Sequence, residues 1–173
     1  MRIFSLLALL GSQFVFASAA RAQCIALADL LAIGADPTVL VSGKTVTDHV
    51  SFEWTYVAPT ASAKESSWTF TPSGASAPTA RLVVRPQRPG QDVVLKTTQA
   101  NCTRELRSEL KARKLTAQPV TCPSCEAVRY QSSDFDVTLY SRMKGEFPFV
   151  VVVHQVPPTM PPAASSPVSA KNH

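Results

Sequence analysis

The stretch from Asp92 to Val156 constrains the fold of this chain more than any other. It contains a strand-like run from Val93 to Thr97, a helix that begins near Asn101, and two further strand-like runs. Three of the chain's four cysteines also lie within it, namely Cys102, Cys122 and Cys125. Any disulfide framework therefore passes through this stretch, and the rest of the chain has to be arranged around it.

The last part of that stretch shows two kinds of strand pattern. Phe135, Val137 and Leu139 alternate with polar residues, which indicates a strand with one buried and one exposed face. The run from Phe149 to Val153 has no alternation. We therefore expect this second strand to lie in the interior of a sheet with both of its faces covered.

The segment after Thr98 has the pattern of an amphipathic helix. Cys102, Leu106 and Leu110 recur at a spacing of four, which places them on one helical face. Asn101 suits the N-cap position, because its side chain can accept a hydrogen bond from an otherwise unpaired amide. This is the best-specified helix in the sequence.

Shorter patterns precede this helix. Residues Cys24 to Ile33 predict a short helix that ends at Gly34, and no pattern is readable from Thr38 to Asp48. Alternation recurs in three segments: 52–56, 68–70, and 79–98, where Pro and Gly at 86–90 predict the turn of a hairpin. We predict an α+β fold with an antiparallel sheet of about six strands and two helices on one face. The order permits two pseudo-repeats, each a helix followed by strands.

Both ends of the chain are expected to lie outside this domain. Residues 1–22 have the charged, apolar and small-residue regions of a secretory signal peptide, with an apolar run too short to span a bilayer. Residues 157–173 are rich in proline and lack apolar periodicity, which predicts a disordered tail. We predict one domain over residues 23–156 in a periplasmic or secreted protein of the bacterial envelope, with no transmembrane span after signal cleavage.

An exported chain is expected to use its cysteines in disulfides, because oxidising compartments favour them. Cys24, Cys102, Cys122 and Cys125 permit two bridges in three connectivities. A redox Cys-x-x-Cys pair lies at a helix N-terminus, whereas the residues after Cys125 have a strand pattern. We predict a disulfide at a corner between strands, and no metal site, because only Cys122 and Cys125 are close in sequence.

Positive charge is concentrated between Arg81 and Lys114, where nine basic residues stand against three acidic ones. Such a patch suits an anionic envelope component or an acidic protein partner; the alternative is an ordinary solvated face. Nucleic acid is not expected, because no aromatic residues are interleaved with the basic ones. The candidate anion-binding residues are Arg81, Arg85, Lys96, Arg104, Arg107 and Lys111.

No motif in the sequence predicts catalysis. The nucleophile elbow, the zinc-binding helix motif and the phosphate loop are all absent. Asp134 and Asp136 would share one side of a regular strand, but two solvent-facing acids are the simpler interpretation. A pocket that combines His49 or His154 with a carboxylate and a nucleophile would contradict a non-catalytic function.

The sequence therefore predicts a small exported binding module without catalytic activity or a cofactor, stabilised by one or two disulfides. Its ligand or partner is not determined by the sequence. Two alternatives stay open. One is an envelope thiol-disulfide redox protein that uses Cys122 and Cys125, and the other is a structural or assembly factor that docks through its tail.

Overall fold

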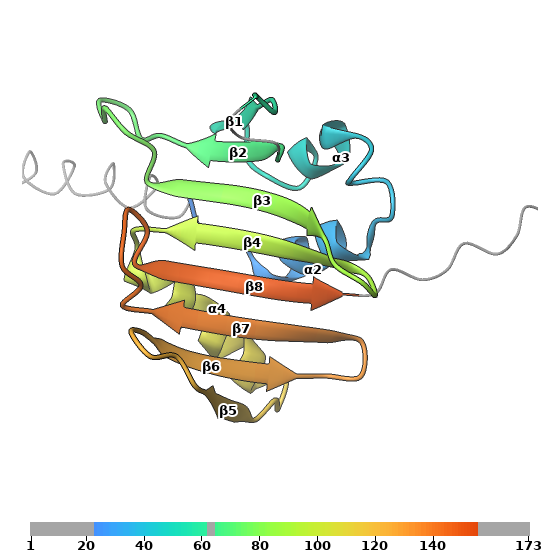
Figure 1. Cartoon of the computed structure of the whole chain (residues 1–173), viewed down its shortest axis with the longest axis vertical. Coiled ribbons are helices and arrows are strands. Elements are labelled where there is room, and N and C mark those ends of the chain that lie inside the picture. Colours follow the sequence, from blue (N-terminus) through green and yellow to red (C-terminus); the bar gives the residue numbers. More distant parts are fainter. Residues whose placement is uncertain (1–22, 62–64, 156–173) are drawn as a thin grey trace, which may run out of the picture.

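A computed structural model describes residues 23–61 and 65–155 of the chain. The predicted signal peptide and the predicted tail lie outside the described residues. The described residues form one eight-stranded antiparallel sheet with helices packed on it (Figure 1). The α+β class agrees with the prediction, but the sheet has more strands than the sequence patterns indicated.

The sheet consists of two four-stranded meanders that meet at its centre. The first half of the chain supplies β1 (Trp54–Val57), β2 (Ser67–Phe70), β3 (Ala80–Pro86) and β4 (Gln91–Thr97). The second half supplies β5 (Ala117–Val120), β6 (Glu126–Gln131), β7 (Phe135–Ser141) and β8 (Phe149–Gln155). The strand order is β1-β2-β3-β4-β8-β7-β6-β5. β4 and β8 pair with each other, so the two halves of the chain meet at the centre of the sheet.

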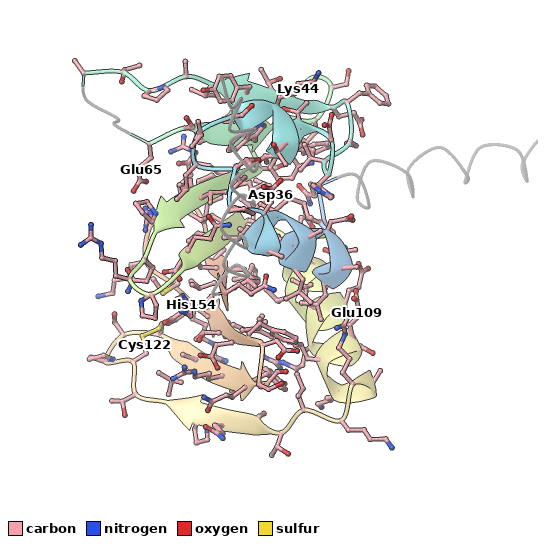
Figure 2. All side chains as sticks on the ribbon, turned by 90° about the vertical axis from the view of Figure 1, so that its right-hand side faces the viewer. Asp36, Lys44, Glu65, Glu109, Cys122 and His154 are labelled. Carbon is pink, nitrogen blue, oxygen red and sulfur yellow. A yellow bond between two sulfur atoms is a disulfide. The ribbon has the colours of Figure 1, made fainter. Side chains whose placement is uncertain are left out.

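Two helices pack on one face of this sheet. α2 (Leu27–Ala35) contacts β4 and β8, and α4 (Ala100–Ala112) contacts β8. Figure 2 shows both on the same side of the strands. A short third helix, α3 (Gly43–Thr47), contacts β1. Its only buried residue is Val46, which is why the sequence around it has no readable period.

The hydrophobic core fills the layer between the sheet and these helices. Leu82 and Leu95 are direct cross-strand partners on β3 and β4, and Val151 on β8 lies opposite Leu95. All three are fully buried. The helices contribute Leu27, Leu30, Ile33, Leu106 and Leu110 to the same cluster. Their spacing of three or four residues is the one that places side chains on a single helical face.

A buried glutamine fixes the C-terminal end of α2 on the sheet. Gln91 Nε2 lies 3.2, 2.8 and 2.8 Å from the carbonyl oxygens of Ile33, Gly34 and Asp36. The last carbonyls of a helix have no partner within the helix. The Gln91 amide therefore adds hydrogen bonds at the end of α2, where Ile33 O and Asp36 O also accept longer backbone bonds of 3.4 Å from Asp36 N and Val39 N.

The structure differs from the expectations of the sequence at three individual elements. The sequence did not indicate β5, which is an exposed edge strand containing Pro119, a residue that strands accept mainly at an edge. α4 begins at Ala100 after Gln99, so Asn101 is not its N-cap; instead Asn101 Nδ2 lies 3.7 Å from Cys24 Sγ. β8 is interior, as expected, but its two faces differ: Val151 and Val153 are buried, whereas Val150 and Val152 are only half-buried.

Candidate functional site

The described cysteines form two disulfides. Cys24 bonds to Cys102 and Cys122 bonds to Cys125. The first bridge joins the segment before α2 to the first turn of α4. The second closes the corner between β5 and β6, where no helix begins, so it lacks the helix N-terminus that lowers the pKa of a redox cysteine.

The face of the sheet opposite α2 and α4 is the candidate functional surface, and we call it the open face. None of the helices in the described residues lies on it (Figures 1 and 2). Because side chains alternate along a strand, it is formed by the residues that alternate with the core positions. On the central strands these are Arg81, Val83, Arg85, Asp92, Val94, Lys96, Asp136, Thr138, Tyr140, Val150, Val152 and His154.

Within the described residues, two hollows adjoin on the open face. The smaller has a volume of about 360 Å³ and is lined by residues of β4 to β8 and of the β3–β4 turn. The larger has a volume of about 620 Å³ and is lined by residues of β3, β4, β7, β8 and the β7–β8 loop. Asp92, Tyr140 and Val152 line both. The two hollows are therefore parts of one recessed surface.

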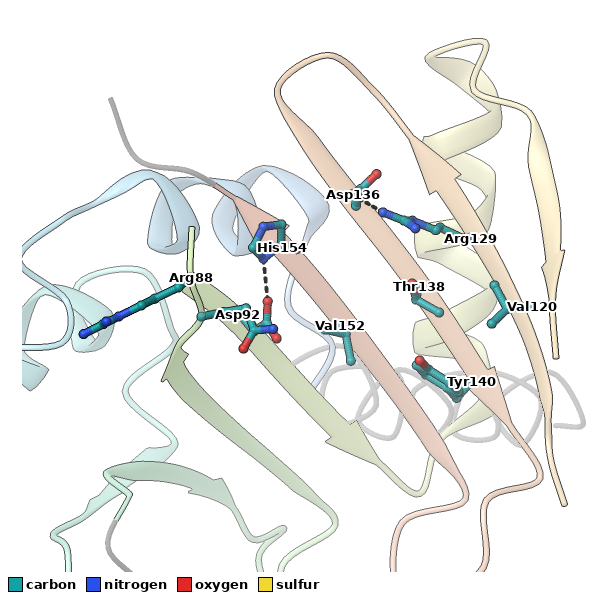
Figure 3. Close-up of a pocket in the computed structure, with 10 residues that line it drawn as sticks. Arg88, Asp92, Val120, Arg129, Asp136, Thr138, Tyr140, Val152 and His154 are labelled. Carbon is teal, nitrogen blue, oxygen red and sulfur yellow. Dashed lines mark hydrogen bonds and ion pairs between the residues drawn. The ribbon is translucent and has the colours of Figure 1, made fainter. Parts of the chain in front are cut away.

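The smaller hollow contains a histidine–aspartate pair and an arginine–aspartate ion pair (Figure 3). His154 Nδ1 lies 2.7 Å from Asp92 Oδ1, and Arg129 forms an ion pair with Asp136. The hydroxyl groups of Thr138 and Tyr140 line the same hollow. The hydrogen bonds of the described residues include none from either hydroxyl to His154. A histidine and a carboxylate thus meet here, in a hollow that Thr138 and Tyr140 also line.

The larger hollow is lined by both basic and apolar side chains. Its basic residues are Arg81, Arg85, Lys96 and Lys144, and its acidic residues are Asp92 and Glu146. Its apolar lining consists of Val94, Val150, Val152, Met143 and Phe147, with the ring of Tyr140 beside them. Such a lining can bind an anion that is attached to an apolar group.

The predicted basic patch is divided between two sides of the molecule. Arg81, Arg85 and Lys96 lie on the open face, whereas Arg104, Arg107 and Lys111 are exposed on α4. The division arises because α4 packs on the sheet through Cys102, Leu106 and Leu110, on the face opposite the basic strand residues. Lys144 joins the open-face group from the β7–β8 loop. No local pattern signalled Lys144, because it lies outside the basic segment of the sequence.

The other candidate residues from the sequence each have a partner of their own. Asp134 precedes β7 and is exposed, where Ser133 Oγ donates a hydrogen bond to it at 2.9 Å. Asp136 is engaged by Arg129 on the open face, so the two aspartates do not pair with each other. His49 Nδ1 lies 3.9 Å from Asp29 Oδ1, away from both hollows.

Residues 23–61 and 65–155 contain no group of three or more His, Cys, Asp or Glu residues that could hold a metal ion. Within the same ranges, every helix is too short or too polar to cross a membrane. Comparisons of the chain with models of known families, with curated proteins and with solved structures found no match.

Proposed function

We propose that this protein is a small exported, disulfide-stabilised binding module that contacts its partner through the open face of the sheet. One observation carries the proposal. The helices cover one face of an eight-stranded sheet, while the opposite face carries two adjoining hollows that combine basic and apolar side chains. A concave surface with apolar lining and a few placed polar groups is the usual form of a binding site.

The centre of the open face is apolar although no helix of the described residues covers it. Val83 and Val94 are direct cross-strand partners there, and each is only 4 % exposed. Long side chains such as those of Arg81, Arg85 and Lys96 can cover apolar neighbours with their stems and keep their charges in water. A partner that displaces these stems gains access to an apolar surface on a rigid sheet, at little cost in ordering the backbone.

The disulfides support an exported location. Free thiols are absent among the described residues, and both bridges are of the kind that oxidising compartments maintain. The proposal of a periplasmic or secreted protein rests on these bridges together with the signal-like pattern of residues 1–22.

A crosslinking experiment tests the proposed surface. A photoreactive benzoylphenylalanine at Thr138 on the open face, compared with one at Ser108 on α4, identifies the protein in contact with each side. The captured partner is then purified, and its dissociation constant is measured with the Thr138→Lys and Ser108→Lys variants. We expect the first variant to weaken binding at least about tenfold and the second to leave it unchanged.

Two results would contradict the proposal. If the two variants bind the partner with equal affinity, or if Ser108→Lys weakens binding more than Thr138→Lys does, the contact surface lies elsewhere. Urea unfolding of both variants establishes that each is folded before its affinity is compared.

The thiol-disulfide alternative has less support, because the Cys122–Cys125 corner lies between two strands. We expect the purified protein to catalyse the reduction of insulin by dithiothreitol no faster than a Cys122→Ser/Cys125→Ser variant does. A rate above that of the variant would favour the redox function. The tail of the assembly-factor alternative lies outside the described residues.

A further inference from the structure

We infer that the larger hollow on the open face binds an acidic segment of a partner protein, in which a carboxylate stands next to an apolar or aromatic side chain. This inference rests on the proposed binding function and adds the chemistry of the ligand. It is carried by an unpaired basic couple, by the apolar surface beside it, and by the acidic residues that limit how much negative charge the hollow accepts.

The basic couple consists of Arg81 and Lys96. They are direct cross-strand partners on β3 and β4, a position in which like charges destabilise the strand pair. Within the described residues neither has an ion-pair partner, and Arg81 Nε is buried without a hydrogen-bond acceptor. A carboxylate placed between the two side chains would remove the repulsion and accept charge-assisted hydrogen bonds from the guanidinium and ammonium groups.

The apolar surface lies directly beside this couple. Val150 on β8 is the cross-strand partner of Lys96, and Val152 follows it on the same face. Phe147 also lines the hollow, with its ring centroid 6.0 Å from the guanidinium carbon of Arg81. This contact holds the guanidinium over an aromatic ring. A ligand whose carboxylate reaches Arg81 would therefore place its adjacent group over Val150 and Val152.

The acidic lining argues against a polyanion. Asp92 and Glu146 line the same hollow, and Arg85 Nε lies 2.9 Å from Glu65 Oε1. A sulfated polysaccharide or an anionic membrane would bring many negative charges close to these carboxylates, and like charges at such distances repel. One or two carboxylates, aimed at Arg81 and Lys96, avoid that repulsion.

The shape of the hollow favours a protein segment over a flat surface. The β7–β8 loop stands at one end of the strands and the β3–β4 turn at the other. The recess between them is open to solvent and has a volume of about 620 Å³. A protruding loop can enter such a recess, whereas the plane of a membrane cannot follow it.

A minimal probe of this chemistry is the dipeptide N-acetyl-aspartyl-phenylalanine amide, titrated to about 10 mM and followed through the NMR signals of the valine methyl groups. Its control is the asparaginyl analogue, which has the same shape without the charge. We expect the aspartyl probe to shift the signals of Val150 and Val152. We also expect it to bind about tenfold more tightly than its analogue, the factor that one hydrogen bond to a charged group provides.

Two arginine variants supply a matched pair. In Arg81→Gln the preference for the aspartyl probe should disappear, whereas Arg104→Gln, which removes the same charge from α4, should retain it. If Arg81→Gln proves unfolded by urea titration, Lys96→Met serves in its place, with a reduction of the preference as the expected result.

Several outcomes would overturn the inference. They are equal binding of the two dipeptides, no shift of the Val150 and Val152 signals, or unchanged selectivity in Arg81→Gln. Binding of heparin or of phosphatidylglycerol vesicles through Arg81 and Lys96, more tightly than the dipeptide, would replace the acidic segment with a polyanion or a membrane. If the dipeptide fails while a crosslinked partner still contacts Thr138, only the ligand chemistry is wrong. If the partner contacts Ser108 instead, the proposed function fails as well.

Discussion

The two disulfides should differ strongly in their contributions to the free energy of unfolding. The bridged residues of Cys24–Cys102 are 78 positions apart, and those of Cys122–Cys125 are 3 apart. A bridge restricts the unfolded chain more when it closes a longer loop. The chain-entropy relation gives about 4.5 kcal/mol for the first bridge and about 1.6 kcal/mol for the second at room temperature.

The position of the longer bridge in the fold supports this ranking. Its loop contains α2, α3 and the strands β1 to β4, which make up the first half of the described chain. Next to the bridge, Thr79 Oγ1 donates a hydrogen bond of 2.7 Å to Gln23 Oε1. A single neutral hydrogen bond contributes roughly 1 kcal/mol, so it cannot replace the bridge.

Urea unfolding of two double variants measures the difference, with the fluorescence of Trp54 and Trp68 as the signal. We expect Cys24→Ala/Cys102→Ala to lose about 3 to 5 kcal/mol and Cys122→Ala/Cys125→Ala to lose less than about 2 kcal/mol. The slope against urea should be steeper for the first variant, because its unfolded chain is no longer restricted by the long loop. Cys102 is 1 % exposed, so its truncation also leaves a small cavity. Chemical reduction of the unmutated protein keeps both sulfur atoms and separates the two effects.

Equal losses in the two variants would refute the entropic reasoning, as would a larger loss at Cys122 and Cys125. A loss that vanishes when the protein is reduced rather than mutated would assign the effect to the cavity.

Three further substitutions have defined outcomes in the same urea assay. Gln91→Met keeps the approximate shape of the side chain but removes its amide, so we expect a loss of about 1 to 3 kcal/mol from the lost hydrogen bonds to the carbonyls at the end of α2; unchanged stability would contradict that role. Leu82→Ala, at a fully buried central position, should cost about 2 to 5 kcal/mol, and a loss below that range would mean that the core closes over the cavity. Phe52→Ser, at a side chain that is 98 % exposed, should stay within about 0.5 kcal/mol of the unmutated protein; a larger loss would reveal a contact of Phe52 in the folded state.

Local periodicity predicted most of the elements of this fold. The hairpin of β3 and β4, the amphipathic α4, and the strands β7 and β8 each carry a run of apolar residues at the spacing of the element they form. The missing strand β5 is short and exposed, so it has no buried positions to mark it. The pattern of buried residues in the sequence therefore indicates the class of the fold. An element with few buried residues has no apolar periodicity and is missed.

The sequence predicted only part of the candidate site. The basic residues of the strands were recognised, but they were grouped with those of α4. A count of charges along the chain does not show which side of the molecule each residue occupies. The pairing of β4 with β8 brings Asp92 opposite His154, although they are 62 residues apart. No local pattern specifies that pairing.

By itself, the sequence determined the α+β class, the order of most helices and strands, and the strand context of the Cys122–Cys125 pair. Only the tertiary structure decided the strand order, the disulfide partners, and the separation of Arg81 and Lys96 from the basic residues of α4. The physical reason is the range of the interactions. Periodicity reflects which side of an element is buried, whereas the choice of neighbour depends on contacts between segments that are distant in the chain.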